Sequence, residues 1–125
     1  MEVLSIVLQS LLALLFLIAG LGKLVGFKMH IENFQHWRLP QWFRIVTGIV
    51  ELAGAAALIV GYWDLSWVAL GALILGITGI GGIITHLRAQ DSFKQMFMIF
   101  LLAIISIVLF AIHVSNLADF PGFTS

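Results

Sequence analysis

Four long apolar runs, separated by short polar connections, make up most of this chain. They extend from Val3 to Val25, from Trp42 to Tyr62, from Leu65 to Leu87 and from Met96 to Val114. The hydrocarbon core of a bilayer is about 30 Å thick, and an α-helix needs about 20 apolar residues to cross it. Each run is long enough to do so, and the pattern therefore predicts four transmembrane helices.

The architecture follows from what lipid permits. Only helices and closed barrels satisfy every backbone N–H and C=O group inside a bilayer, and these runs lack the alternation of polar and apolar positions found in barrel strands. The connections are short, which makes successive helices antiparallel neighbours. We therefore expect an all-α integral membrane protein in which residues 1–125 form a single domain, a four-transmembrane-helix antiparallel bundle.

Composition supports this class and excludes others. The chain is 62% hydrophobic and 10% charged with a formal net charge of zero, so no basic stripe is available and nucleic-acid binding is not expected. The absence of cysteine excludes disulfide exchange, thiolate metal sites and iron–sulfur clusters carried by the chain itself. The partner that the composition predicts is the lipid bilayer.

Basic residues predict the orientation of the bundle. All six gather near the first and third connections: Lys23, Lys28, Arg38, Arg44, Arg88 and Lys94. The N-terminus, the turn at Asp64 and the C-terminal tail carry none. An excess of Lys and Arg marks the cytoplasmic side of a membrane protein. With four crossings, both termini are expected outside.

Glu51 lies inside the second apolar run, where a carboxylate is costly and usually faces a partner charge or a polar cavity. Helical phase places Gly54 on the Glu51 face, and it places Gly20 and Lys23 together on the first helix. Side chains lean toward the N-terminus of their own helix, so Lys23 and His86 lean toward Glu51 from antiparallel neighbours. We expect a ligand-binding cluster of these three side chains, with Gly20 and Gly54 leaving space beside it. The alternative is a purely structural ion pair.

A second polar layer is expected near the outer side, formed by Gln9, Ser106 and His113. The alternatives are that Ser106 bonds back within its own helix and that His113 is an end residue reaching the interface. The connection over residues 27–41 mixes apolar and polar positions in the manner of an interfacial segment. His30 and His36 are expected to be solvated there, and no metal site is expected because no third ligand has suitable spacing.

Short motifs in three of the four runs resemble the DoxX-like family of small bacterial membrane proteins. They are Phe16-Leu17-Ile18-Ala19-Gly20-Leu21-Gly22-Lys23-Leu24, Pro40-Gln41-Trp42, Val50-Glu51-Leu52-Ala53-Gly54-Ala55 and His86-Leu87. The resemblance implies a four-helix protein of the bacterial inner membrane. Members of the family are often labelled oxidoreductases, and relatives form part of a thiosulfate:quinone oxidoreductase.

Two functions remain open. The first is a redox-associated subunit that holds no cofactor within its own chain and binds a quinone-like molecule or a lipid at the charged cluster, with His86 exchanging protons. The second is a non-enzymatic membrane module in which the charged cluster is structural. In that case the glycine-rich third helix would dock a partner protein or a second copy.

Overall fold

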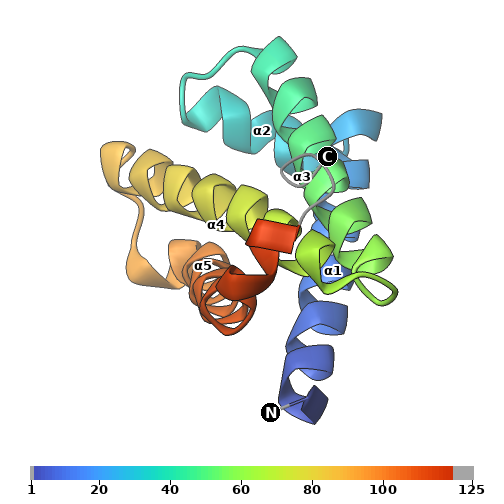
Figure 1. Cartoon of the computed structure of the whole chain (residues 1–125). Helices are drawn as coiled ribbons and strands as arrows, with labels where there is room; N and C mark the ends of the chain where they lie inside the picture. Colours follow the sequence, from blue (N-terminus) through green and yellow to red (C-terminus); the bar gives the residue numbers. More distant parts are fainter. Residues whose placement is uncertain (1, 120–125) are drawn as a thin grey trace.

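The computed structural model describes residues 2–119, with the side chains of residues 3–118. Its elements are α1 (Glu2–Val25), α2 (Lys28–His36), α3 (Gln41–Val60), α4 (Leu65–Arg88), α5 (Phe93–His113) and a short 3₁₀ helix, η1 (Val114–Asp119) (Figure 1). No strand occurs among these residues, and α1, α3, α4 and α5 are each long and apolar enough to cross a membrane. The predicted all-α four-helix membrane fold is confirmed. The first residue and the tail beyond Asp119, which entered the orientation argument, lie outside the described residues.

Capping residues set the ends of the spanning helices. Pro40 is the N-cap of α3, and Gly61 is its C-cap. The fourth span begins at Phe93, ahead of the predicted start at Met96, because Ser92 and Gln95 form a capping box. Reciprocal bonds of this kind satisfy backbone N–H groups that the first turn of a helix leaves unpaired. The polar first turn of α5 is therefore helical although it lies outside the apolar run.

The spanning helices pack in the order α1, α3, α4, α5, and α1 makes a smaller contact with α5. Figure 1 shows α1 alongside α3, and α4 alongside α5. The core between them consists of fully buried apolar side chains: Leu12, Phe16, Leu58, Val68, Leu75 and Leu109. Many other large apolar side chains are exposed on the outer faces, as a protein solvated by lipid tails requires.

Glycines let the backbones of neighbouring helices approach closely. A Cβ atom added to Gly20 of α1 would lie 2.9 Å from the carbonyl oxygen of Gly48 in α3. A Cβ atom added to Gly71 of α4 would lie 2.9 Å from the carbonyl oxygen of Gly54 in α3. Small residues at helix crossings are typical of membrane bundles, where close packing replaces the hydrophobic effect as the force between helices.

Three helices end with a residue in the left-handed conformation. These residues are Gly26 (φ 85°) after α1, Arg38 (φ 60°) near the end of α2 and Gln90 (φ 61°) after α4. In each case the next backbone N–H bonds to a carbonyl five residues earlier, at 2.9–3.0 Å, which is the Schellman pattern of helix ends. The chain is thereby turned back on itself at the end of the bundle that carries the basic residues.

Candidate functional site

Lys23 and Glu51 meet between α1 and α3. The Nζ atom of Lys23 lies 2.9 Å from Oε1 of Glu51, and the two side chains are 12% and 4% exposed. The approach is within ion-pair distance, but it lacks hydrogen-bond geometry, and Oε1 is a buried atom with no hydrogen-bond partner among the described residues. The phase argument thus brought together two of the three side chains in the predicted cluster.

Arg44 adds a second link between the same two helices. Its guanidinium Nη1 donates to the backbone carbonyl of Lys23, and its Nε donates to Oε1 of Gln41 at 2.7 Å. Arg44 lies two helical turns before Glu51, so both side chains face α1. A cation near the C-terminus of α1 also stabilises the helix dipole. The sequence analysis used Arg44 only for orientation, although its phase relative to Glu51 signals this role.

His30 lies on α2 and is buried, with 8% of its surface exposed. The prediction that it is solvated was wrong, because the turn at Gly26 folds α2 back against the end of α1. A Cβ atom added to Gly22 would lie 3.0 Å from the His30 ring. Burial, the largest cause, and the nearby cations Lys23 and Arg44 together lower the pKa of His30 to about 4.

His86 pairs with Asp91 and not with Glu51, contrary to the predicted cluster. Its Nδ1 lies 2.6 Å from Oδ2 of Asp91, in the turn between α4 and α5. Nε2 of His36 lies 2.7 Å from the other carboxylate oxygen, Oδ1, and the indole N–H of Trp37 donates to Oδ2 at 3.1 Å. The hydrogen bond from His36 is the largest cause that lowers the pKa of Asp91 to about 2, with Trp37 and His86 also lowering it.

These contacts join the end of α2 to the turn after α4. The Trp37 and His86 rings meet edge to face with centroids 5.0 Å apart, and Nη2 of Arg88 donates to the Trp37 carbonyl at 2.6 Å. His36 was expected to be solvated, and its side chain is 55% exposed while bonded to Asp91. Sequence reasoning missed Asp91. The available signal was an acidic residue five positions after a histidine that ends an apolar run.

The predicted second layer does not form a single cluster. Nε2 of Gln9 donates to the Leu58 carbonyl at 2.7 Å, while the Ser106 hydroxyl donates to the Leu102 carbonyl at 2.8 Å within its own helix. His113 is buried and bonded to Ser5, with Nε2 and Oγ 2.6 Å apart. The back-bonding alternative therefore describes Ser106. The Gln9 bond joins α1 to α3 and the Ser5 bond joins α1 to α5.

The expectation that Gly20 and Gly54 leave space for a ligand was wrong. A Cβ atom at Gly20 would meet both Gly48 and the Leu52 side chain at 2.9 Å, and one at Gly54 would lie 2.5 Å from the Leu75 side chain. The neighbouring helices fill the space that the missing side chains provide, because the glycines serve helix contact. Among the described residues, no group of three His, Asp or Glu side chains is arranged to hold a metal ion.

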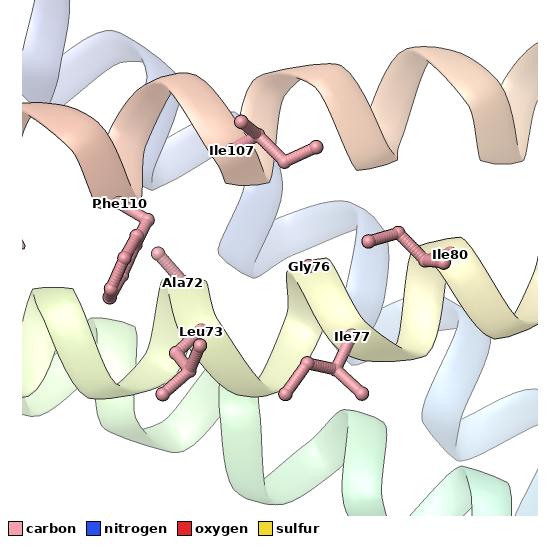
Figure 2. Close-up of a pocket in the computed structure, with 7 residues that line it drawn as sticks. All are labelled: Ala72, Leu73, Gly76, Ile77, Ile80, Ile107 and Phe110. Atoms are coloured by element: carbon pink, nitrogen blue, oxygen red, sulfur yellow. The ribbon is translucent and has the colours of Figure 1, made fainter.

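A shallow apolar groove of about 100 Å³ lies between α4 and α5. Figure 2 shows its lining, in which Ile107 and Phe110 of α5 face Ala72, Leu73, Gly76, Ile77 and Ile80 of α4. None of these side chains belongs to the predicted charged cluster. The groove lacks the polar groups that would orient a ligand.

Comparisons with known proteins point to one family. The sequence model of a family described as DoxX-like matches residues 7–109. The chain is also 34% identical over 107 residues to the uncharacterized protein YdgD of Bacillus subtilis (strain 168), a match that covers 84% of this chain and 93% of that protein. No solved structure matches the chain.

Proposed function

This chain belongs to the DoxX-like family of multi-pass membrane proteins, and we propose that it is a redox-associated subunit that binds a quinone-like molecule. The binding site is the Lys23–Glu51 pair, where α1 and α3 cross. Family resemblance supports the association with redox chemistry. The geometry of the pair supports the binding of a lipophilic molecule with a polar ring, which reaches the site from the bilayer.

One observation carries this proposal: Oε1 of Glu51 is buried, and its ion-pair contact with Lys23 at 2.9 Å lacks hydrogen-bond geometry. Buried polar atoms nearly always have a hydrogen-bond partner, so an unpartnered one requires an explanation. A ligand hydroxyl would supply the missing bond, and the Lys23 ammonium, which has three N–H donors, would bind a ligand carbonyl. The apolar surroundings suit the remainder of such a ligand.

Lys23 and Glu51 would bind and orient the ligand, whereas His86, which pairs with Asp91, is not part of this site. A bound quinone supplies the electron-transfer chemistry, which side chains alone do not provide. Because Gly20 and Gly54 are occupied by helix contacts, the ligand enters by displacing a side chain next to the pair. Leu52, which contacts Gly20 and is half-buried, is suitably placed to move.

The second candidate function is a non-enzymatic module that docks or stabilises a partner protein. The close glycine packing around the charged pair favours it, because an ion pair at a helix crossing fixes the register of the two helices. In this case Lys23 and Glu51 need no ligand. Their joint replacement by uncharged side chains would then leave the protein folded and active in docking.

Ligand binding is tested with the purified protein in lipid nanodiscs. Thermal unfolding is followed with and without a short-chain benzoquinone and a naphthoquinone. Ligand at about 100 times its Kd stabilises a folded protein by about 2.7 kcal/mol, which shifts the melting temperature by several degrees. Glu51→Gln should lose this shift. The matched control Glu32→Gln changes a carboxylate whose side chain is 59% exposed, and it should retain the shift.

Absence of a shift with either quinone in the wild type would reject the ligand proposal. In that event, a Lys23→Met/Glu51→Gln double variant that regains wild-type stability would establish the structural module. A quinone shift that survives Glu51→Gln would place the binding site elsewhere in the bundle.

We also propose the bacterial inner membrane as the location, with both ends of the four-helix unit outside. The basic residues at the Lys23 end of the bundle support this orientation through the positive-inside rule. The Lys23–Glu51 pair and Asp91 then lie on the cytoplasmic side.

A further inference from the structure

Arg44 is a buried cation without an acidic partner. The residue is 9% exposed, and its hydrogen bonds go to two neutral oxygens, the Lys23 carbonyl and Oε1 of Gln41. The ion pairs formed by the described residues do not include its guanidinium. Buried charges are normally paired with an opposite charge, and bonds to neutral groups leave the charge of Arg44 uncompensated.

The other titratable groups around Arg44 do not supply the missing negative charge. Glu51 is paired with Lys23 at 2.9 Å, so these two charges compensate each other. His30 is uncharged at neutral pH, because burial and the nearby cations Lys23 and Arg44 hold its pKa at about 4. The junction of α1, α2 and α3 therefore retains the positive charge of Arg44.

The helix ends at this junction add to the positive potential. The N-terminus of a helix has a positive partial charge, which an acidic side chain in the first turn can offset. Neither α2 nor α3 has a side-chain cap or an acidic residue there. Arg44 lies at the end of the first turn of α3, and a Cβ atom added to Gly26, just before α2, would lie 3.4 Å from its Nη1. The negative end of α1, whose Lys23 carbonyl accepts a bond from Arg44, opposes only one of these two N-termini.

The unused donors of Arg44 reach the surface of the protein. Within the part of the chain that the structure describes, Oε1 of Glu51 is the one fully enclosed side-chain N or O atom without a hydrogen bond. The Nη2 atom of Arg44, which also has no hydrogen bond there, is therefore accessible from outside. Its neighbours Trp42 and Phe43 are 65% and 39% exposed, and exposed aromatic rings at the end of a span mark the headgroup level.

We propose that Arg44 binds the phosphate group of a phospholipid in the leaflet at the basic end of the bundle. Guanidinium N–H groups form short, charge-assisted bonds with phosphate oxygens. The phosphodiester of a phospholipid has a single negative charge, which compensates that of Arg44. The Lys23 carbonyl and Gln41 hold the guanidinium in place. This site does not depend on quinone binding at the Lys23–Glu51 pair.

Thermal unfolding in dodecyl maltoside, a detergent without phosphate, tests the site. The protein is titrated with dioctanoylphosphatidylglycerol and, separately, with dioctanoylglycerol, which has the same acyl chains but no phosphate. The phospholipid should raise the melting temperature by several degrees as it approaches saturation, and the diacylglycerol should not. Sodium phosphate at matched ionic strength should also have no effect, because it lacks the acyl chains that hold the lipid beside the span.

Arg44→Gln should lower the affinity for the phospholipid by about tenfold or more, which is the effect of losing a hydrogen bond between charged groups. The matched control is Arg38→Gln, which removes an exposed arginine from the same end of the bundle. It should retain the wild-type affinity, because the charge that it removes is already solvated.

A second measurement does not depend on the folding of Arg44→Gln, which also loses the bond to the Lys23 carbonyl. In Arg38→Gln/Arg88→Gln, Arg44 is the only arginine of the chain. This variant is labelled with carbon-13 at arginine Cζ and placed in dioleoylphosphatidylglycerol vesicles. Solid-state NMR should show dipolar coupling between the Arg44 label and the phosphorus-31 nucleus of the lipid.

Each contrary result overturns the inference. Equal shifts in melting temperature with the phospholipid and the diacylglycerol would show that the phosphate is not recognised. An equal loss of affinity in Arg44→Gln and Arg38→Gln would assign the effect to surface charge in general, and absence of carbon–phosphorus coupling would exclude direct contact. A shift produced by sodium phosphate alone would identify free phosphate, and not a lipid, as the occupant.

Discussion

The Lys23–Glu51 pair gives the sharpest quantitative prediction, because it can be removed one partner at a time. We consider Lys23→Met, Glu51→Gln and the double variant. At 2.9 Å and an effective dielectric constant of about 20, two unit charges attract each other by about 6 kcal/mol. Much of this is offset by the cost of removing both charges from water. The pair as a whole therefore contributes little to the free energy of unfolding, whereas removing only one partner lowers that free energy strongly.

Each single variant is expected to destabilise the protein by about 3 to 5 kcal/mol, because one buried charge is left without its partner. The double variant should lie within about 1 kcal/mol of the wild type. Unfolding free energies measured by denaturant titration in mixed micelles then give a coupling energy of several kcal/mol. The control cycle uses Lys28 and Glu32, whose side chains are 89% and 59% exposed, and should give about 0.5 kcal/mol or less.

Additive effects at Lys23 and Glu51 would refute this reasoning. A coupling energy below about 0.5 kcal/mol is the value for independent sites. It would mean that the two side chains do not share a low-dielectric environment, and that the closeness of α1 and α3 depends on the glycine contacts alone.

Three further predictions concern packing, pH and topology. Gly20→Ala should reduce the stability of the folded protein by about 1 to 3 kcal/mol, since the added Cβ would lie 2.9 Å from a carbonyl oxygen. The control Gly81→Ala places its Cβ in open space and should leave stability unchanged or raise it by up to about 1 kcal/mol. Equal losses of stability for the two variants in thermal unfolding would contradict the packing argument. The pKa of His30 falls from 6.5 to about 4 on folding. Between these pH values the unfolded chain binds more protons than the folded one, so the unfolding free energy should decrease as pH falls through that range. His30→Gln should make the unfolding free energy less dependent on pH there, and an unchanged pH dependence would count against the burial of His30. In cells, a thiol reagent that does not cross the membrane should label Asp64→Cys from the outside, and labelling from the cytoplasm alone would reverse the orientation.

The spanning helices could be predicted from the sequence because a lipid bilayer permits few backbone structures. Hydropathy identified the four spans, and helical phase with the lean of the side chains brought Lys23 to Glu51. Both residues lie on uninterrupted helices, in which the direction of one side chain determines the directions of the other side chains along the helix. Errors in the span boundaries occurred where a capping box extended α5 into a polar turn.

The other contacts depend on chain reversals, and these carry weak sequence signals. His30 becomes buried because the chain turns at Gly26, where a glycine is expected. The reversals at Arg38 and Gln90 use side chains that rarely adopt positive φ angles. No local pattern indicates these two turns. The spacing of Asp91 five residues after His86 was the available signal of their pairing, but without the turn at Gln90 it did not distinguish Asp91 from Glu51 as the partner of His86.

Gln90 shows how such a turn becomes stable. A left-handed conformation costs a residue with a side chain about 1–2 kcal/mol, and glycine would avoid that cost. The same turn, however, places Asp91 where three donors reach its carboxylate, and a hydrogen bond to a charged group contributes about 1.5–3 kcal/mol. The bonds outweigh the strain. The turn is therefore stabilised by the partners of Asp91, which come from α2 and α4.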